Sequence, residues 1–274
     1  MSEREIPEIL RQRLIDYLNA GKRVDGRGPE EWRDIEVKLG ISNKAEGSCS
    51  MKLGNCEVYA GVKLAVVEPY PDSSDEGTMM VSAELSPLAS GEFEGGRPGI
   101  DSIELARVID RGIRESGFID FKKLCIKEGK KVWSVMIDLQ PMNADGNLLD
   151  VAGIAALIAL GQAKMPVYDE EEDKVDYDTH KDSLPLVKEA MSFNTTFFKV
   201  GDSLIVDPTR EEELSADYRI SIAAASNNGK PMITAIQKGK AVAIPQEDID
   251  KILELVEKNF KVMFPKIDKL VWGK

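Results

Sequence analysis

Histidine and cysteine are scarce in this chain of 274 residues, which has one histidine and three cysteines. Cys49, Cys56 and Cys125 fit no metal-ligand spacing, and an odd number of cysteines cannot all be paired. They are typical of buried thiols in a reducing compartment. His180 has no cysteine or histidine beside it and stands next to an acidic run, which favours a surface loop. We therefore expect no metal ion bound by this chain itself.

Long apolar runs and an excess of basic charge are also missing. No stretch approaches the length of a membrane span and no signal peptide is visible, so we expect a cytoplasmic protein with no membrane partner. Lys and Arg number 36 against 48 Asp and Glu, which gives a formal net charge of −12. This balance argues against a stand-alone nucleic-acid binder but allows a local basic patch.

Residues 101–117 carry the clearest helical pattern of the chain. The pair Asp101 and Glu104 reads as a capping box, and Gly117 is a usual C-terminal stop. The apolar residues of the segment fall on one side at about 100° per residue: Leu105, Ala106, Val108, Ile109 and Ile113. The sequence thus predicts an amphipathic helix that packs by this side.

Three arginines, Arg107, Arg111 and Arg114, gather on the opposite side of this helix. A row of guanidinium groups suits a row of phosphates. Each arginine also has an acidic neighbour at helical spacing, namely Glu104, Asp110 or Glu115. An ordinary solvated, salt-bridged face is therefore the alternative interpretation.

The remaining pattern indicates two α+β halves joined by a linker. We expect a helix and latch at residues 1–33, a first half at 34–165, an acidic loop or linker at 166–189 and a second half at 190–274. The predicted helices are amphipathic 3–19, buried 148–163 and amphipathic 246–264, and the strands lie within 34–69, 78–85, 124–126, 132–139, 193–199, 203–206, 218–224 and 232–237. In the first helix Ile6, Ile9, Leu10, Leu14 and Leu18 share a side, and in the last Ile249, Ile252, Leu253, Val256 and Phe260 do.

Two connecting segments have their own chemistry. In residues 22–33 the pair Asp25-Gly26 is a turn signal, and Arg27 and Arg33 are placed to hold the turn by ion pairing, as a structural latch. The glycine-rich loop 90–100 lacks the lysine pattern of a phosphate-binding P-loop, so we interpret it as a flexible loop.

Several motifs resemble the RNase PH family. They are RVDGR-x5-R from Arg23 to Arg33, GSCSMKLGNCEVYAGV at 47–62, the helix IELARVIDRGIR and the turn NADGN before the buried helix. The resemblance covers nearly the whole chain in the family's order and spacing. The N-terminal helix and the insertion around 166–185 make the chain most similar to the larger, non-catalytic ring subunits of the archaeal exosome. The implied fold is an N-terminal half like domain 2 of ribosomal protein S5 and a C-terminal RNase PH-like half.

The resemblance implies a role in phosphorolysis, in which inorganic phosphate attacks the 3′-terminal phosphodiester of single-stranded RNA. It implies a catalytic RNase PH-like partner, a ring of three such pairs and RNA-binding cap subunits. The complex would use inorganic phosphate and Mg²⁺, with no cofactor bound by this subunit itself. Such a reaction needs cations on the RNA backbone, an anion site for phosphate and carboxylates near the leaving oxygen.

Departures from the family pattern mark this chain as non-catalytic. Active members have Gly-Gly-Thr-Arg and then Thr or Ser before the buried helix, which surrounds phosphate at a helix N-terminus. Here the positions read Gly146, Asn147, Leu148, Leu149 and Asp150. We expect a vestigial phosphate site in which the Asp150 carboxylate repels the attacking anion. The paired arginines that precede the long helix in active subunits are Ile100 and Asp101 here.

The acidic pair of the family is half kept, since Asp217 matches the second carboxylate and Glu211 stands where the first should be. A vestigial Mg²⁺ site and a plain acidic surface turn are both compatible with it. Arg107 and Arg111 match positions that reach into the sibling's active site and hold RNA phosphates. Arg114, on the same stripe, and Arg97, in the glycine-rich loop, are further candidates.

The sequence thus predicts a non-catalytic exosome ring subunit that lends RNA-binding arginines to its partner. A self-sufficient phosphorolytic exonuclease resembling RNase PH, and a purely structural ring subunit, are the alternatives.

Overall fold

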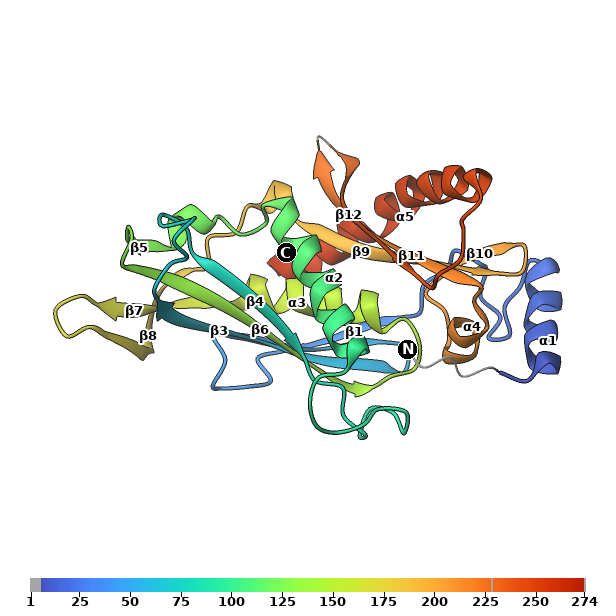
Figure 1. Ribbon diagram of the computed structural model, residues 1–274, viewed down its shortest axis with the longest axis horizontal. Helices are drawn as coiled ribbons and strands as arrows, with labels where there is room; N and C mark the ends of the chain where they lie inside the picture. The colour runs from blue at the N-terminus through green and yellow to red at the C-terminus, as the bar shows by residue number, and fades with distance from the viewer. Residues whose placement is uncertain (1–5, 228, 274) are drawn as a thin grey trace.

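Two large β-sheets with helices between them, and a separate two-stranded sheet, make up the protein (Figure 1). The computed structural model describes residues 6–227 and 229–273. The first sheet has the order β1-β2-β3-β6-β4, with β5 paired to β6. Its strands are β1 (Ile35–Leu39), β2 (Gly47–Leu53), β3 (Cys56–Val67), β4 (Thr78–Ala83), β5 (Cys125–Lys127) and β6 (Lys131–Asn143). All neighbours are antiparallel except β4 and β6, whose parallel pairing uses a helical crossover.

The second sheet is antiparallel, in the order β10-β9-β11-β12. Its strands are β9 (Ser192–Val200), β10 (Ser203–Val206), β11 (Tyr218–Asn227) and β12 (Lys230–Gly239). The helices are α1 (Glu8–Asn19), α2 (Ile100–Ser116), α3 (Leu148–Gln162), α4 (Arg210–Ser215) and α5 (Gln246–Trp272), with short 3₁₀ turns η1 (Phe121–Leu124) and η2 (Lys188–Ala190). Within the described residues no helix combines the length and apolarity needed to cross a membrane.

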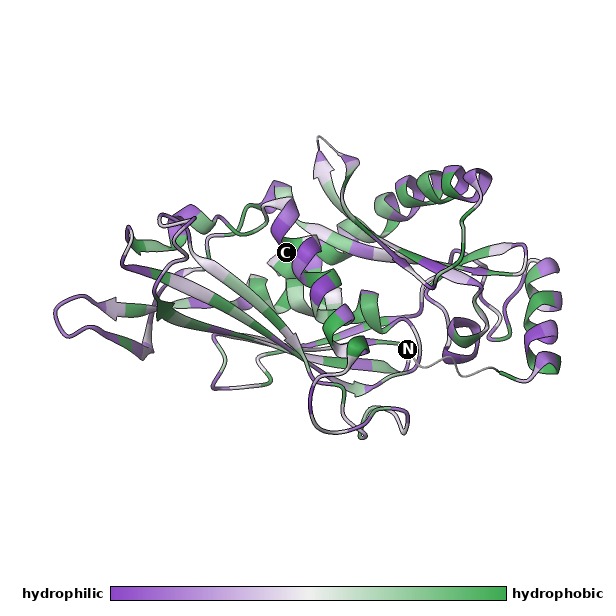
Figure 2. Cartoon of the chain, in the orientation of Figure 1, coloured by the Kyte–Doolittle hydropathy of each residue, from purple (hydrophilic) through white to green (hydrophobic). Residues whose placement is uncertain are grey.

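Helices α2 and α3 join the two halves into one core. Helix α3 contacts β2 and β3 of the first sheet, β9 of the second and α5, while α2 contacts β4 on one side and β12 on the other. Because α3 is covered on every side, it is apolar all round (Figure 2). The expected α+β architecture with two halves and an N-terminal helix is confirmed. Most of its buried apolar residues form one cluster across both sheets, and a smaller cluster joins Leu18 of α1 to β9 and β10.

Helix α2 packs as expected but starts differently. Leu105, Val108, Ile109 and Ile113 are buried, and Gly117 ends the helix in the left-handed region at φ +71°. The predicted capping box is wrong, because the N-cap is Gly99, which has no side chain to cap the helix. Asp101 is already inside the first turn, where its carboxylate interacts favourably with the positive end of the helix dipole.

Residues 166–189, expected as a linker or loop, contain a β-hairpin instead. Strands β7 (Lys164–Asp169) and β8 (Lys174–Ser183) pair antiparallel and project at one end of the molecule (Figure 1). The Asp169 carboxylate accepts the amides of Glu171 and Glu172 and so shapes the turn. The hairpin is largely exposed, so its strands carry acidic residues and lack the apolar alternation by which a strand is predicted. His180 lies on this hairpin and is exposed.

The terminal helices also depart from their predicted faces and lengths. Helix α1 buries Leu14 and Leu18 but leaves Ile9 87% exposed, and the predicted residues 3–5 lie outside the described ones. Ile249 and Leu253 of α5, expected inside, are also exposed, while Ile252, Val256 and Phe260 of the same helix are buried as expected. Helix α5 continues through Pro265 to Trp272, because Ile267 and Val271 still find buried sites against the core.

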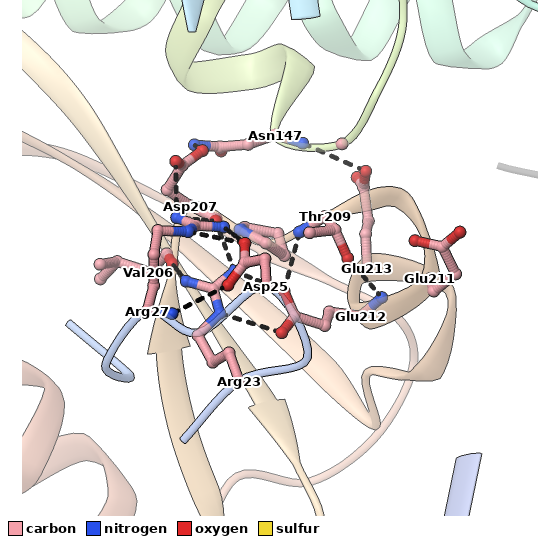
Figure 3. Close-up of polar contacts among 12 residues, drawn as sticks. Arg23, Asp25, Arg27, Asn147, Val206, Asp207, Thr209, Glu211, Glu212 and Glu213 are labelled. Atoms are coloured by element: carbon pink, nitrogen blue, oxygen red, sulfur yellow. Dashed lines mark hydrogen bonds and ion pairs between the residues drawn. The ribbon is translucent and has the colours of Figure 1, made fainter. Parts of the chain in front are cut away.

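The segment 22–33 is held by one fully buried carboxylate, that of Asp207 (Figure 3). It accepts hydrogen bonds from the backbone and guanidinium of Arg33 (2.7 to 3.0 Å), from Arg27 (3.0 Å) and from the Asn147 amide (3.0 Å). The latch expected from Arg27 and Arg33 is therefore present, and it ties three distant parts of the chain together. Asp207 itself has φ +46°, a conformation that aspartate tolerates better than most residues.

Arg23 forms the second part of this latch, with a fully buried side chain. Its guanidinium donates to Glu212 in α4 and to the backbone oxygens of Val206 (3.0 Å) and Asp207 (2.7 Å). Glu212 in turn accepts the Thr209 amide in a capping box at the start of α4. The latch thereby fixes the position of α4 and of the charged side chains that α4 carries.

We predict that Asp207→Ala destabilises the protein by about 3–5 kcal/mol, because it removes the close carboxylate partner of the largely buried Arg33 and one of the two carboxylates that Arg27 binds. Urea unfolding at neutral pH measures this loss. Glu257→Ala, which breaks an exposed ion pair to Lys261, is the control and should leave the midpoint unchanged. Equal midpoints for the two variants would contradict the importance of the latch.

Candidate functional site

The arginine side of α2 faces solvent along its whole length. Arg107 and Arg111 are both exposed, and the Arg111 side chain retains 59% of its accessible surface. Arg111 lies 3.3 Å from Glu115, one turn further on. Glu104, expected to pair with Arg107, instead binds Arg219 of β11 at 2.8 Å. Among residues 6–227 and 229–273, Arg107 has no ion pair, so its charge is available to a ligand.

Arg114, in contrast, is bound within the protein. Its guanidinium donates to both oxygens of Asp110 (2.7 and 3.0 Å) and to the Met79 carbonyl (2.9 Å). The hydrogen-bonded Asp110 carboxylate raises the pKa of Arg114 above its ordinary value. Arg97 lies exposed in the loop that leads into α2. The structure thus separates Arg107 and Arg111 from Arg114, whose side chain has a structural role.

The turn before α3 is closed by the segment that leads into α4. Gly146 has φ +81°, and a Cβ placed on it would lie 2.5 Å from the Pro208 carbonyl oxygen, so only glycine fits here. Asn147 occupies the N-cap in the left-handed region, and its side chain donates to Asp207 and does not cap the helix. Its backbone N–H donates to the carboxylate of Glu213 at 3.2 Å (Figure 3).

The expectation that Asp150 presents its charge to a docking phosphate is wrong. Its side chain is fully buried and points to β9, where it accepts the Thr196 amide (2.9 Å) and hydroxyl (2.7 Å). Burial raises the pKa of Asp150 to about 7, against the lowering effect of these hydrogen bonds. The acid that meets the N-terminus of α3 is Glu213, which sequence reasoning did not single out.

A cavity of about 70 Å³ opens beside this turn. Apolar residues line it from the first half and α2: Leu85, Phe93, Leu105, Ala144, Leu148 and Leu149. Charged residues complete the wall: Glu92, Asp101, Glu104, Arg210, Glu213 and Arg219. Arg210 pairs with Glu92 and lies 3.6 Å from Glu213, so each cation of the cavity already faces a carboxylate.

The predicted acidic pair is not assembled as a metal site. Both oxygens of Asp217 are engaged, one by Arg11 of α1 (2.7 Å) and the other by the Gly201 amide (3.0 Å). Glu211 is exposed on α4 and points away from the neighbouring polar network (Figure 3). Within the part of the chain that the structure describes, no three Asp, Glu, His or Cys side chains gather to hold a metal ion. Glu211 and Asp217 therefore do not fit Mg²⁺ here.

Both domains of one known family match this chain. Residues 31–166 match domain 1 of the 3′ exoribonuclease family, and residues 191–258 match its domain 2. This chain belongs to the 3′ exoribonuclease family. The family's two domains correspond to the two sheets, with α2 and α3 between them in the first domain's range.

Within the 3′ exoribonuclease family, the chain is similar to archaeal exosome proteins. It is 45% identical over 258 residues to the exosome complex component Rrp42 of Thermococcus onnurineus, with 93% of each chain covered. Its fold is similar to a chain of the Archaeoglobus fulgidus exosome with RNA bound to the active site, with a TM-score of 0.82 and 38% identity over 94% of this chain and 98% of that one. A second solved structure, an archaeal exosome core, gives a TM-score of 0.79 and 36% identity over 95% and 96%.

Sequence reasoning on this member of the 3′ exoribonuclease family missed four of the six charged residues of the cavity, namely Glu92, Arg210, Glu213 and Arg219. Arg210 and Glu213 stand in an acidic run that reads as a surface turn, and Arg219 stands in a strand. The one signal was Arg219, the only charged residue of a largely buried strand, which indicates a buried partner.

We predict that Asp150→Asn removes a pH-dependent loss of stability. The native pKa of about 7 lies above the value near 3.9 expected for an unfolded chain. Between these values only the native state keeps the proton, so stability falls as pH rises. From pH 5 to pH 8 the free energy of unfolding of wild type should fall by about 2–3 kcal/mol relative to that of Asp150→Asn. Urea unfolding at each pH measures this change.

Asp248→Asn is the matched control for this pH series. Hydrogen bonds from Lys199 and Tyr218 outweigh the opposing effect of burial and lower the pKa of Asp248. The Asp248 contribution is therefore lost only as pH falls through that lowered pKa, below the chosen window. A difference between wild type and Asp150→Asn that stays constant from pH 5 to pH 8 would refute the assignment.

Proposed function

We propose that this chain is a non-catalytic ring subunit of an archaeal exosome, a complex that degrades RNA from the 3′ end with inorganic phosphate. In this proposal it pairs with a catalytic partner of the same fold, and three pairs close a ring that carries RNA-binding cap subunits. The names of its relatives and the solved exosome structures it resembles support this assignment.

One observation supports the division of labour more than any other. Arg107 is exposed and has no ion pair among the described residues, and Arg111 lies beside it, while the chain's own turn at residues 146–150 is closed. Cations on an exposed stripe contact backbone phosphates, which carry no sequence information. The stripe thus serves the partner's reaction by holding RNA, largely independently of sequence.

The self-sufficient exonuclease is disfavoured by the same site. Positions 148 and 149 are leucines, and the anion position at α3 is taken by a carboxylate. No step of phosphorolysis can be routed through Glu211 and Asp217, since Asp217 is bound to Arg11. Any Mg²⁺ that the complex uses would be held by the partner.

We predict that the purified chain alone releases no nucleoside diphosphate from single-stranded RNA in phosphate and Mg²⁺, because it lacks a phosphate position. The reconstituted complex with the catalytic partner should release it under the same conditions and serves as the positive control. Chromatography of the products measures both. Steady turnover by the chain alone would show that it is an enzyme in its own right.

We predict that the double variant Arg107→Glu with Arg111→Glu weakens RNA binding by the reconstituted complex by at least about 100-fold, because charge-assisted hydrogen bonds contribute roughly 1.5–3 kcal/mol each. Its salt dependence should also flatten, by about 0.7 in the log–log slope for each RNA phosphate that the arginines no longer neutralise. Titration of labelled RNA at several salt concentrations measures both effects.

The double variant Arg13→Glu with Lys22→Glu makes the same change of charge at exposed residues of α1 and of the turn that follows it, and is the matched control. It should leave both affinity and slope unchanged. If the α2 variant binds RNA as wild type does while the ring assembles, the chain is a purely structural subunit.

A further inference from the structure

The carboxylate of Glu213 occupies a position that resembles an anion-binding site. It accepts the Asn147 N–H at the N-terminus of α3 (3.2 Å) and lies 3.6 Å from the Arg210 guanidinium. A helix N-terminus of this length attracts negative charge through its free N–H groups and its dipole. The ligand seated here is the protein's own side chain, contributed from α4.

A second cation points to the same place. Arg219 is only 8% exposed and lines the cavity together with Glu213. Its Nη2 binds Glu104, but its buried Nη1 finds no hydrogen-bond partner among the described residues. A buried guanidinium donor left unsatisfied is costly. The Arg219 guanidinium therefore has one more hydrogen-bond donor at the cavity than the neighbouring carboxylates satisfy.

We propose that Glu213 is a built-in anion that fills this chain's latent phosphate-binding position and keeps inorganic phosphate out of it. The biological meaning of this role rests on the proposed ring-subunit function, because excluding phosphate here leaves the partner's site as the place where phosphate binds. The binding frame consists of the α3 N-terminus, Arg210 and Arg219.

Three features make the contact a fixed part of the fold. Glu213 follows Glu212 in α4, and the buried Arg23 guanidinium binds the Glu212 carboxylate. The backbone of Pro208 to Arg210 lies against Gly146 so closely that no Cβ fits between them. The Glu213 side chain is 9% exposed, and burial raises its pKa against the lowering effect of Arg210 and Arg219. An incoming phosphate would meet this carboxylate in a small, partly enclosed cavity, where solvent screens like charges less than at the surface.

The test measures binding of inorganic phosphate to the full chain by titration calorimetry, at constant ionic strength and without RNA or partner. Wild type should show no saturable binding at millimolar phosphate. Glu213→Ala removes the internal anion and should bind phosphate at least tenfold more tightly. Glu213→Asp keeps the charge and is the matched control, which should resemble wild type. Arg219→Met in the Glu213→Ala background should abolish the gain.

Glu213→Gln keeps the shape of the side chain and replaces Glu213→Ala if that variant does not fold. It should gain phosphate binding in the same direction, seen also as a rise in melting temperature in phosphate over chloride. Failure of both variants to bind phosphate better than wild type would overturn the proposal. Because neither turnover nor RNA enters the measurement, that failure is distinct from a failure of the ring-subunit function.

Discussion

The structure depends on the burial of one carboxylate, that of Asp207. Taking a carboxylate out of water is costly unless hydrogen bonds and opposite charge replace the lost hydration. Here Arg27 and Arg33 come from the segment before the first sheet, and Asn147 comes from the turn before α3. None of these contacts is local in sequence, so the carboxylate is satisfied only when both halves have come together. Burial of the Asp207 carboxylate is therefore favourable only in the complete fold.

The same constraint determines what the turn before α3 can do. Asn147 uses its side chain to bind Asp207, which leaves its backbone N–H directed to Glu213. Arg23 holds Glu212 and thereby fixes α4, so that Glu213 is carried to the anion position by a structural element and not by a free loop. Loss of phosphate binding, in the proposed role, is therefore part of the packing between the halves and involves more than the leucines of the sequence motif.

Sequence patterns predicted α3 and the packed side of α2 because periodic burial is a local signal. Long-range partners have no such signal. The three consecutive glutamates show this most clearly: Glu211 is exposed, Glu212 is buried on Arg23, and Glu213 faces the cavity. Composition and spacing are the same for all three, and only the elements packed around them separate their roles. Asp150 was misplaced for the same reason, since its partner Thr196 lies in the other sheet.

Net charge and local charge have different consequences in this chain. With a formal net charge of −12, the surface as a whole repels a polyanion, and the repulsion reaches only about 8–10 Å at physiological salt. An exposed cation such as Arg107 therefore acts on a phosphate that is already close, and contributes little to long-range attraction. Within the cavity screening by salt is weak, and in the proposed role the Glu213 carboxylate keeps an anion away from the N-terminus of α3. In the proposed roles, one chain attracts the phosphates of RNA at α2 and rejects free phosphate at α3, because the two sites differ in exposure as well as in sign.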